Sequence, residues 1–273
     1  MSEALPGRRV LAQVAANTAL ANPEYRELTL VAPVIVAAAS PGQFVHLKLV
    51  GEGSDPFLRR PFSISGLDGD RLTILFRRVG DLTERLAALR PDDAVDVLGP
   101  LGHGYDLTGP PGGRAFLAGG GYGVAPLLIL ARALRDRGVA REVHLLVGAR
   151  TTAHLLWQDR LAAEADWLKT GFATDDGSSG FRGTVLDLLA DRMGPPRVDD
   201  RLFGCGPMAM LGGLARRWPG LPAQVAVENQ MGCGVGVCLG CVLPHAGGTG
   251  HRRYIRICTE GPVFDARALE WVA

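Results

Sequence analysis

Four of the five cysteines lie close together near the end of the chain, and their spacing could hold a metal cluster. Three of them form a C-x4-C-x2-C motif, and the fourth follows after a longer gap. This arrangement is typical of a plant-type 2Fe-2S centre, in which four thiolates hold two irons. A disulfide framework would spread its cysteines through the chain. A structural zinc site and buried free thiols are the alternatives. The predicted metal ligands are Cys233, Cys238, Cys241 and Cys258.

The residues around these cysteines support a cluster more than a zinc site. Gly232, Gly234, Gly236 and Gly240 surround the first three cysteines. Glycine readily adopts positive φ, so the loop can turn its backbone N-H groups toward cluster sulfurs and tune the reduction potential. A zinc knuckle needs no such run of glycines. We expect Cys258 to end a strand that runs from residue 253 to residue 257.

Two glycine-rich turns predict a dinucleotide site. The segment from Ala115 to Pro126 reads AFLAGGGYGVAP, a short apolar strand that enters a glycine turn and then an apolar helix. Backbone without Cβ atoms can approach a pyrophosphate at the positive end of that helix. One such turn alone could be purely structural. A second turn joins another strand to a helix at the carboxyl edge of the same predicted sheet, where open α/β sheets bind ligands. The two turns contribute Gly119, Gly120, Gly121, Gly123, Gly204, Cys205, Gly206 and Pro207.

Cys205 has two interpretations. It lies beside the predicted nicotinamide site, but it is equally well explained as a small buried hydrophobic residue. We give it no catalytic role and do not count it among the cluster ligands. No residue is assigned as a catalytic acid, base or nucleophile.

The elements that must position these groups follow from the hydrophobic pattern. Short runs such as 25–31, 43–49 and 71–77 are rich in Val, Leu, Thr and Phe and are separated by Gly, Pro and Asp, which predicts an antiparallel β-barrel. One helix is expected at 82–89. After residue 113, strands alternate with helices, which predicts a parallel sheet with crossover helices. The last 45 or so residues are too few for a large core, so metal would organise them.

Composition limits the classes of partner. The 29 basic and 28 acidic side chains nearly cancel, so no long-range field favours nucleic acid or an anionic membrane. No apolar run approaches the roughly 20 residues needed to span a bilayer, and no signal peptide is evident. We therefore expect a cytoplasmic protein that binds neither nucleic acid nor membrane.

The order of motifs along the chain resembles the ferredoxin-NADP reductase superfamily. Within it, the chain is most similar to the electron transfer subunits of class B, NAD-linked dihydroorotate dehydrogenase. The resemblance covers nearly the whole chain and rests on PGQFV (41–45), RRPFS (59–63), GPLG (99–102), GART (148–151), TDDG (174–177), MGCGVGVCLGC (231–241) and CTEGPVF (258–264).

The resemblance implies three domains. These are an antiparallel Greek-key β-barrel that binds FAD (1–103), a parallel five-stranded α/β domain that binds NAD (104–228) and a small C-terminal 2Fe-2S domain (229–273). The family's R-P-x-S flavin motif and a second flavin-contacting strand match this sequence, and its Gly-Thr pair near the pyrophosphate is replaced by Leu-Thr. The implied flavin residues are Arg60, Pro61, Phe62, Ser63, Leu75, Phe76, Arg77, Leu82 (by position only) and Thr83.

The resemblance also implies a function in pyrimidine biosynthesis. A nicotinamide exchanges two electrons as hydride and a 2Fe-2S cluster takes one at a time, so a flavin must stand between them. The family's electrons come from the FMN of a separate catalytic subunit, which oxidises dihydroorotate to orotate. The expected assembly is a heterotetramer with two copies of each chain.

Two other functions stay open at this point. The chain could be an NAD(P)H-ferredoxin or hydrogenase-type oxidoreductase subunit of the same superfamily, or an iron-sulfur redox sensor without a working flavin site. The sequence itself does not favour NAD, since the strand at 142–147 leads to Arg150 without the acidic residue that commonly binds ribose hydroxyls. The choice of NAD over NADP therefore rests on the resemblance.

Overall fold

The structure is a computed structural model that describes residues 7–51, 57–108, 112–250 and 253–271. Its contacts divide the chain into two compact units. The first, the barrel unit, comprises Met1–Gly104, Asn229–Leu243 and Tyr254–Val263. The second, the sheet unit, comprises Tyr105–Glu228, Pro244–Arg253 and Phe264–Ala273. The C-terminal segment thus contributes to both units.

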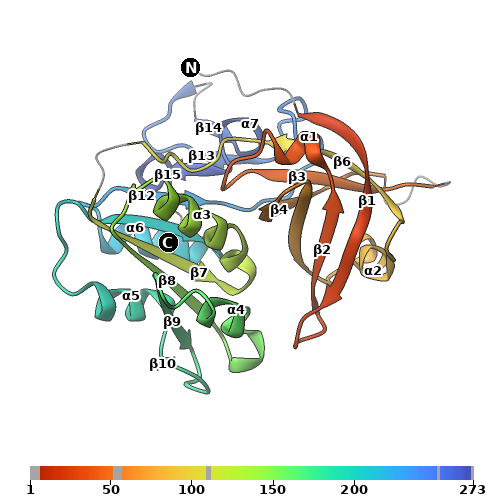
Figure 1. Ribbon diagram of the computed structural model, residues 1–273. Helices are drawn as coiled ribbons and strands as arrows, with labels where there is room; N and C mark the ends of the chain where they lie inside the picture. The colour runs from red at the N-terminus through yellow and green to blue at the C-terminus, as the bar shows by residue number, and fades with distance from the viewer. Residues whose placement is uncertain (1–6, 52–56, 109–111, 251–252, 272–273) are drawn as a thin grey trace. The chain divides into compact units, whose positions relative to one another are not determined.

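The barrel unit is built on a closed antiparallel barrel with strand order β1-β2-β5-β4-β3-β6. Because β5 lies between β2 and β4, the order is that of a Greek key, as predicted (Figure 1). Inward side chains alternate with outward ones along each strand, and those such as Leu28, Ile64, Ile74 and Val97 are fully buried and form its core. Its elements are β1 (Arg8–Ala19), β2 (Tyr25–Val31), α1 (Pro33–Val36), β3 (Phe44–Leu49), β4 (Arg60–Asp68), β5 (Arg71–Arg77), α2 (Asp81–Ala88) and β6 (Ala94–Leu101).

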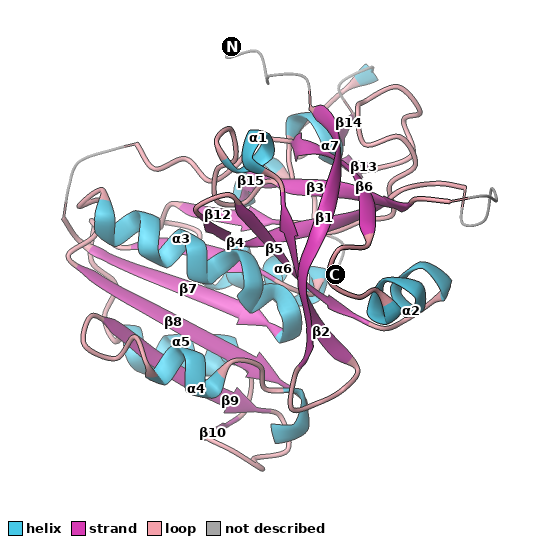
Figure 2. Ribbon diagram, turned by 45° about the vertical axis from the view of Figure 1, so that its right-hand side comes forward, coloured by secondary structure: helices cyan, strands magenta, loops and turns pink. Residues whose placement is uncertain are grey.

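The sheet unit carries the strand order β10-β9-β8-β7-β11-β12-β15. Its central strand β7 is buried along almost its whole length, as expected for a parallel strand covered on both faces. Right-handed crossovers place α3 and α4 on one face and α5 and α6 on the other, which Figure 2 shows. The elements are β7 (Arg114–Gly120), α3 (Val124–Asp136), β8 (Glu142–Ala149), α4 (Gln158–Ala162), β9 (Leu168–Thr174), β10 (Phe181–Arg182), α5 (Val185–Met193), β11 (Arg201–Cys205), α6 (Met208–Arg217), β12 (Ala223–Ala226) and β15 (Val263–Asp265).

The predicted fold class is confirmed, with two additions at the sheet edges. The five predicted parallel strands are β9, β8, β7, β11 and β12. The two-residue β10 and the three-residue β15 extend the sheet on either side. Both are too short to show a hydrophobic period, and they form because an ordered neighbouring strand offers them hydrogen-bonding partners.

The segment with the cysteine cluster has little regular structure. It contains a two-stranded sheet of β13 (Val242–Pro244) and β14 (Tyr254–Arg256), followed by the four-residue helix α7 (Ile257–Glu260). The expectation that Cys258 ends a strand is wrong, because the strand stops at Arg256 and Cys258 lies in α7. The backbone N-H of Ile257 donates to the carbonyl oxygen of Cys241 at 2.9 Å. This bond holds α7 beside the loop from Cys233 to Cys241, which we call the cysteine loop.

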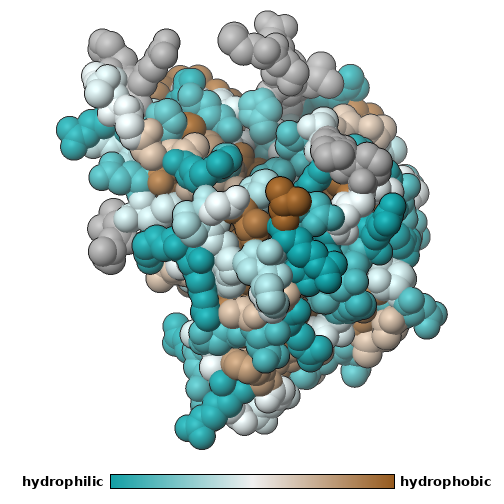
Figure 3. All heavy atoms as spheres, turned by 90° about the vertical axis from the view of Figure 1, so that its left-hand side faces the viewer, coloured by the Kyte–Doolittle hydropathy of each residue, from teal (hydrophilic) through white to brown (hydrophobic). Residues whose placement is uncertain are grey.

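The surface agrees with the balanced composition. Figure 3 shows a face on which hydrophilic residues predominate and hydrophobic residues gather in small groups. No helix in the described part of the chain is long and apolar enough to cross a membrane.

Candidate functional site

The structure brings the four predicted cluster ligands together as two pairs in the barrel unit. The Cys233 sulfur accepts the backbone N-H of Cys238 at 3.4 Å, and the Cys241 sulfur accepts the backbone N-H of Cys258 at 3.4 Å. Among the described residues, no three His, Cys, Asp or Glu side chains are grouped to hold a single metal ion. Pairs of thiolates suit a binuclear cluster, in which each iron takes two protein ligands, better than one tetrahedral zinc.

Glycines shape the loop around these sulfurs. A Cβ at Gly232 would lie 3.3 Å from the Cys238 sulfur, and one at Gly236 would lie 2.7 Å from Thr259 Cγ2. Gly234 and Gly236 have φ of +73° and +83°, a region that side chains with a Cβ rarely adopt. The loop therefore needs glycine both for its conformation and for the close approach of its backbone to the thiols. This cradle and its four thiols fit a 2Fe-2S cluster.

The two pairs differ in how easily their thiols ionise. Burial opposes ionisation of Cys233, but backbone N-H groups of Cys238 and Val235 outweigh it and lower the pKa to about 7. Burial, helped by the neighbouring Cys241, raises the pKa of Cys258 to about 12. Cys233 thus offers a thiolate near neutral pH, whereas Cys258 needs the charge of bound metal to lose its proton.

The two predicted nicotinamide turns meet at the carboxyl edge of the sheet. Strand β7 lies between β8 and β11, and the chain moves outward through β8 and β9 before it returns to β11. The gap between β7 and β11 is therefore the topological switch point, where open α/β sheets bind dinucleotides. The turn after β7 and the turn after β11 pack directly on each other, since a Cβ at Gly123 would lie 2.2 Å from the Cys205 carbonyl oxygen.

Cys205 is fully buried at the end of β11. Burial raises the pKa of its thiol well above the usual range, so the thiol stays protonated and is a poor nucleophile. Beside it, the hydroxyl of Tyr105 donates to the carbonyl oxygen of Gly204 at 3.3 Å. On the same unit, the hydroxyl of Tyr122 donates to Glu228 Oε2 at 2.9 Å. Tyr122 was not predicted from the sequence, although it stands inside the glycine turn.

The predicted flavin residues lie on two neighbouring strands and one helix of the barrel unit. Arg60, Pro61, Phe62 and Ser63 are on β4, and Leu75, Phe76 and Arg77 are on the adjacent β5. The rings of Phe62 and Phe76 meet edge to face at 6.0 Å. Leu82 is buried in α2, and Thr83 closes the first turn of that helix, where its hydroxyl accepts the N-H groups of Val79 and Gly80.

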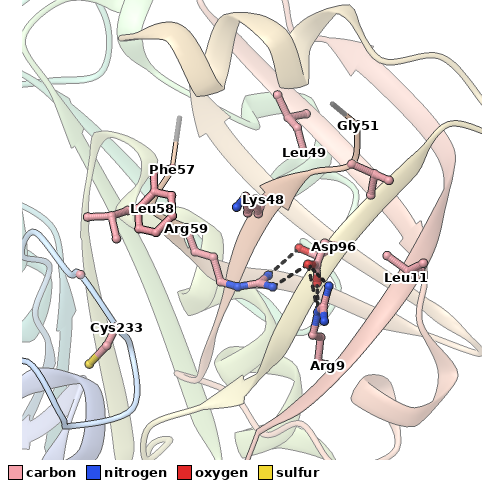
Figure 4. A pocket seen from close by; sticks show the side chains of 12 residues that line it. Arg9, Leu11, Lys48, Leu49, Gly51, Phe57, Leu58, Arg59, Asp96 and Cys233 are labelled. Atoms are coloured by element: carbon pink, nitrogen blue, oxygen red, sulfur yellow. Dashed lines mark hydrogen bonds and ion pairs between the residues drawn. The ribbon is translucent and has the colours of Figure 1, made fainter. Parts of the chain in front are cut away.

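The structure gives the two adjacent arginines of this motif different environments. Arg59 donates to the buried carboxylate of Asp96 at 2.6 Å, and Arg9 donates to the same carboxylate at 3.0 Å (Figure 4). Hydrogen bonds from these arginines outweigh burial and hold the pKa of Asp96 below its usual value. Arg60 is exposed and donates only to backbone carbonyl oxygens in the hydrogen bonds found for it. Arg60 is therefore the arginine that can turn to a phosphate.

A cavity of about 580 Å³ lies beside this ion pair in the barrel unit. It combines cationic and apolar side chains and reaches the first cluster cysteine, as Figure 4 shows. Its lining includes Arg9, Lys48, Arg59, Leu11, Val50, Phe57, Leu58 and Cys233. Sequence reasoning did not find this cavity, because its residues come from five separate segments without a shared motif.

Comparison with known proteins agrees with this architecture. Residues 117–216 match the family model described as oxidoreductase NAD-binding domain, and residues 228–270 match the iron-sulfur cluster binding domain of dihydroorotate dehydrogenase B. The structure of an NADH-dependent reduced ferredoxin-NADP oxidoreductase superposes with a TM-score of 0.81 and 25% identity, covering 99% of this chain and 92% of that one. A ferredoxin NADP+ reductase from Neisseria gonorrhoeae shares the fold at a TM-score of 0.65 and 19% identity, covering 78% of this chain and 91% of that one.

These matches define the class as an NAD-linked oxidoreductase with the ferredoxin-NADP reductase fold. Two curated relatives are named dihydroorotate dehydrogenase B (NAD(+)), electron transfer subunit. The one from Bacillus caldolyticus is 43% identical over 93% of this chain and 95% of its own length. The one from Geobacillus thermodenitrificans is 43% identical over 88% of this chain and 90% of its own length. The chain belongs to this family of electron transfer subunits, and the predicted cofactor set of FAD, 2Fe-2S cluster and NAD agrees with it.

Proposed function

We propose that this chain passes electrons between the FMN of a dihydroorotate dehydrogenase catalytic subunit and NAD(+), through its 2Fe-2S cluster and FAD. The observation that carries the proposal is the presence, in one chain, of a paired cysteine site, a glycine-lined switch point and a flavin-type barrel. A redox sensor has no need of the switch point. A bound FAD would supply the link between the two-electron chemistry of a nicotinamide and the one-electron chemistry of the cluster.

We assign the chain's own residues three tasks. The turns at 119–123 and 204–207 hold the dinucleotide, since their missing Cβ atoms let backbone N-H groups reach a pyrophosphate. Arg60 and the neighbouring β4 and β5 residues hold FAD, and the four cysteines hold the cluster. The proposed division into domains at 1–103, 104–228 and 229–273 follows these tasks.

The decisive experiment is a visible spectrum of the anaerobically purified chain before and after NADH, with iron, sulfide and FAD measured in the same sample. We expect about two irons, two sulfides and one FAD per chain, by the composition of the cofactors, and bleaching by NADH. Zinc in place of iron, or a flavin that NADH leaves oxidised, would contradict the proposal. Recovery with a hydrogenase subunit instead of the dihydroorotate-oxidising subunit would favour the alternative oxidoreductase function.

The surface next to the cluster suits a protein partner. Val237 and Leu239, in the loop that joins the cysteines, are 81% and 61% exposed. Apolar side chains at such exposure mark interaction sites when they gather in one place, and the cavity beside Cys233 adds Phe57 and Leu58 in the same unit. We infer that the catalytic subunit docks here, in a heterotetramer of two copies of each chain.

A charge at this surface should weaken the complex. Val237→Asp is expected to raise the dissociation constant for the catalytic subunit at least tenfold, about 1.4 kcal/mol, because it places an unpaired carboxylate in an apolar contact. Titration followed by light scattering measures the constant, and the iron content should stay native. Val198→Asp, at a 98% exposed valine of the sheet unit, is the control and should bind normally. Equal binding by both variants would place the docking surface elsewhere.

Two carboxylates near Arg150 favour NAD over NADP. The backbone N-H of Asp175 donates to the Ala149 carbonyl oxygen at 3.1 Å, and that of Asp176 donates to the Arg150 carbonyl oxygen at 3.3 Å. Both acidic residues thus lie beside the end of β8, where the adenosine ribose is expected. Their negative charge opposes a 2′-phosphate and balances the positive charge of Arg150, which on its own would suit that phosphate.

Removal of these two charges should relax the cofactor preference. In the double variant Asp175→Asn, Asp176→Asn, the ratio of NADPH to NADH reduction rates is expected to rise about tenfold, equivalent to roughly 1.4 kcal/mol. Stopped-flow flavin reduction measures both rates. Asp166→Asn is the matched control, because it removes an exposed carboxylate before the start of β9. An unchanged ratio would show that the carboxylates do not face the ribose.

A further inference from the structure

His46 is a buried polar residue that none of the sites above uses. It lies on β3 with no exposed surface. Neither Nδ1 nor Nε2 has a hydrogen-bond partner among the residues that the structure describes. An imidazole buried in this way forfeits its hydrogen bonds to water, which costs free energy unless a partner replaces them. A neutral imidazole always offers one N-H donor and one lone pair.

The ring of His46 lies directly against the cysteine loop. A Cβ built on Gly234 would be 2.7 Å from Cε1, 2.8 Å from Nδ1 and 3.0 Å from Nε2 of the imidazole. Gly234 follows the ligand Cys233 immediately, and its φ is +73°. The imidazole therefore supports the backbone of the loop at the residue after the first ligand.

The strand pairing places His46 on the face of β3 that it shares with the flavin motif. His46 pairs with Pro61 of β4, and Phe44 pairs with Ser63. Cross-strand partners point to the same side of a sheet, so the side chains of these four residues share one face. The ring of Phe44 lies 5.7 Å from the imidazole. His46 is thus held between the β4 strand and the cysteine loop.

The surroundings keep this imidazole uncharged. Burial, together with the positive charges of Arg59 and Arg60, lowers the pKa of His46 to about 4. No carboxylate is among the groups that shift it. A neutral imidazole cannot act as a cation near the thiolates, but it can donate one N-H.

We propose that His46 is a positioning residue for the 2Fe-2S cluster, which supports the ligand loop at Gly234 and donates a ring N-H to a sulfur atom of the cluster site. The inference rests on the cluster part of the proposed function. The four thiolates and two sulfides of a cluster are the strongest acceptors expected near this ring. The ring contacts Gly234, which directly follows the first ligand, Cys233. Hydrogen bonds to cluster sulfurs stabilise the more negative, reduced form. His46 should therefore raise the reduction potential.

The test compares three substitutions in the full chain, purified with its cofactors under anaerobic conditions. His46→Phe keeps an aromatic ring and removes both nitrogens, whereas His46→Gln and His46→Asn each keep an amide N-H near the position of one ring nitrogen. The readouts are iron and sulfide content, the midpoint potential of the cluster, and the pulsed electron paramagnetic resonance spectrum of protein labelled with ¹⁵N-histidine.

We expect His46→Phe to have a more negative cluster potential than the native chain and at least one amide variant to recover part of the difference. The native spectrum should show coupling to a histidine nitrogen that every His46 variant lacks. His154→Gln, the same change at a residue of the sheet unit, should keep the native potential and coupling.

Three outcomes would overturn the proposal. His46→Phe with full iron and an unchanged potential would show that the residue only packs. A native spectrum without histidine nitrogen coupling would exclude the hydrogen bond, even if His46→Phe failed to assemble a cluster. Coupling that survives in the amide variants would belong to another histidine. Absence of iron and sulfide from the native chain would instead refute the proposed function, so the two failures are distinguishable.

Discussion

Replacement of Cys241 by serine is expected to abolish the cluster while it leaves the chemistry of flavin and nicotinamide intact. Cys241 is buried, and its sulfur accepts the backbone N-H of its partner Cys258. Even changes next to metal ligands lower metal affinity about 10- to 100-fold, so loss of a ligand should leave less than roughly a tenth of the native iron. Electron transfer to the catalytic subunit should fall to background.

The same variant separates the two halves of the proposed function. The glycine turns belong to the sheet unit. The predicted flavin strands β4 and β5 belong to the barrel unit, as Cys241 does, but Cys241 is part of neither strand. Cys241→Ser should therefore retain FAD and reduce a two-electron dye with NADH at a native rate. Cys205→Ser is the control for iron content, because Cys205 lies outside the cluster motif in the other unit. Native iron in Cys241→Ser would remove this residue from the ligand set.

The local pattern of hydrophobic residues was sufficient to predict the elements in which that pattern alternates or repeats regularly. The predictions at 25–31 and 71–77 match β2 and β5 to the residue, since each combines a clear hydrophobic period with a polar or glycine boundary. The strand-turn-helix order around both glycine turns was predictable for the same reason. Glycine and proline mark where the chain must change direction, and the flanking apolar runs fix the type of element.

Tertiary contacts decide what the pattern could not. His46 sits in the run Phe44 to Leu47, and only the cysteine loop, some 190 residues later, explains why a histidine is buried there. The Arg59–Asp96 pair joins residues 37 positions apart, so the sequence could not assign Arg59 and Arg60 to different tasks. Cys258 was expected to end a strand at 253–257, but β14 stops at Arg256, where Ile257 bonds to Cys241, 16 residues earlier, and α7 begins.

Substitution of Gly123 by alanine should disable the nicotinamide site, although local backbone preference favours alanine. Gly123 has φ of −60° and ψ of −11° at the start of α3, a helical conformation in which alanine is normally the more stable residue. The added Cβ would, however, lie 2.2 Å from the Cys205 carbonyl oxygen and 2.6 Å from its carbonyl carbon. Both contacts are with backbone, which cannot rotate away as a side chain can.

The clash must therefore separate the turn after β7 from the turn after β11. Overpacking of this kind costs about 1 to 3 kcal/mol. Displacement of the two turns that we propose to bind the pyrophosphate should lower the rate of flavin reduction by NADH about 10- to 100-fold. Stopped-flow reduction measures the rate, while FAD and iron content should stay native because their sites belong to the barrel unit. Gly220→Ala, at a glycine where an added Cβ would meet no atom within 4 Å, should reduce at the native rate. Native reduction by Gly123→Ala would mean that contact between the two turns is not required for nicotinamide binding.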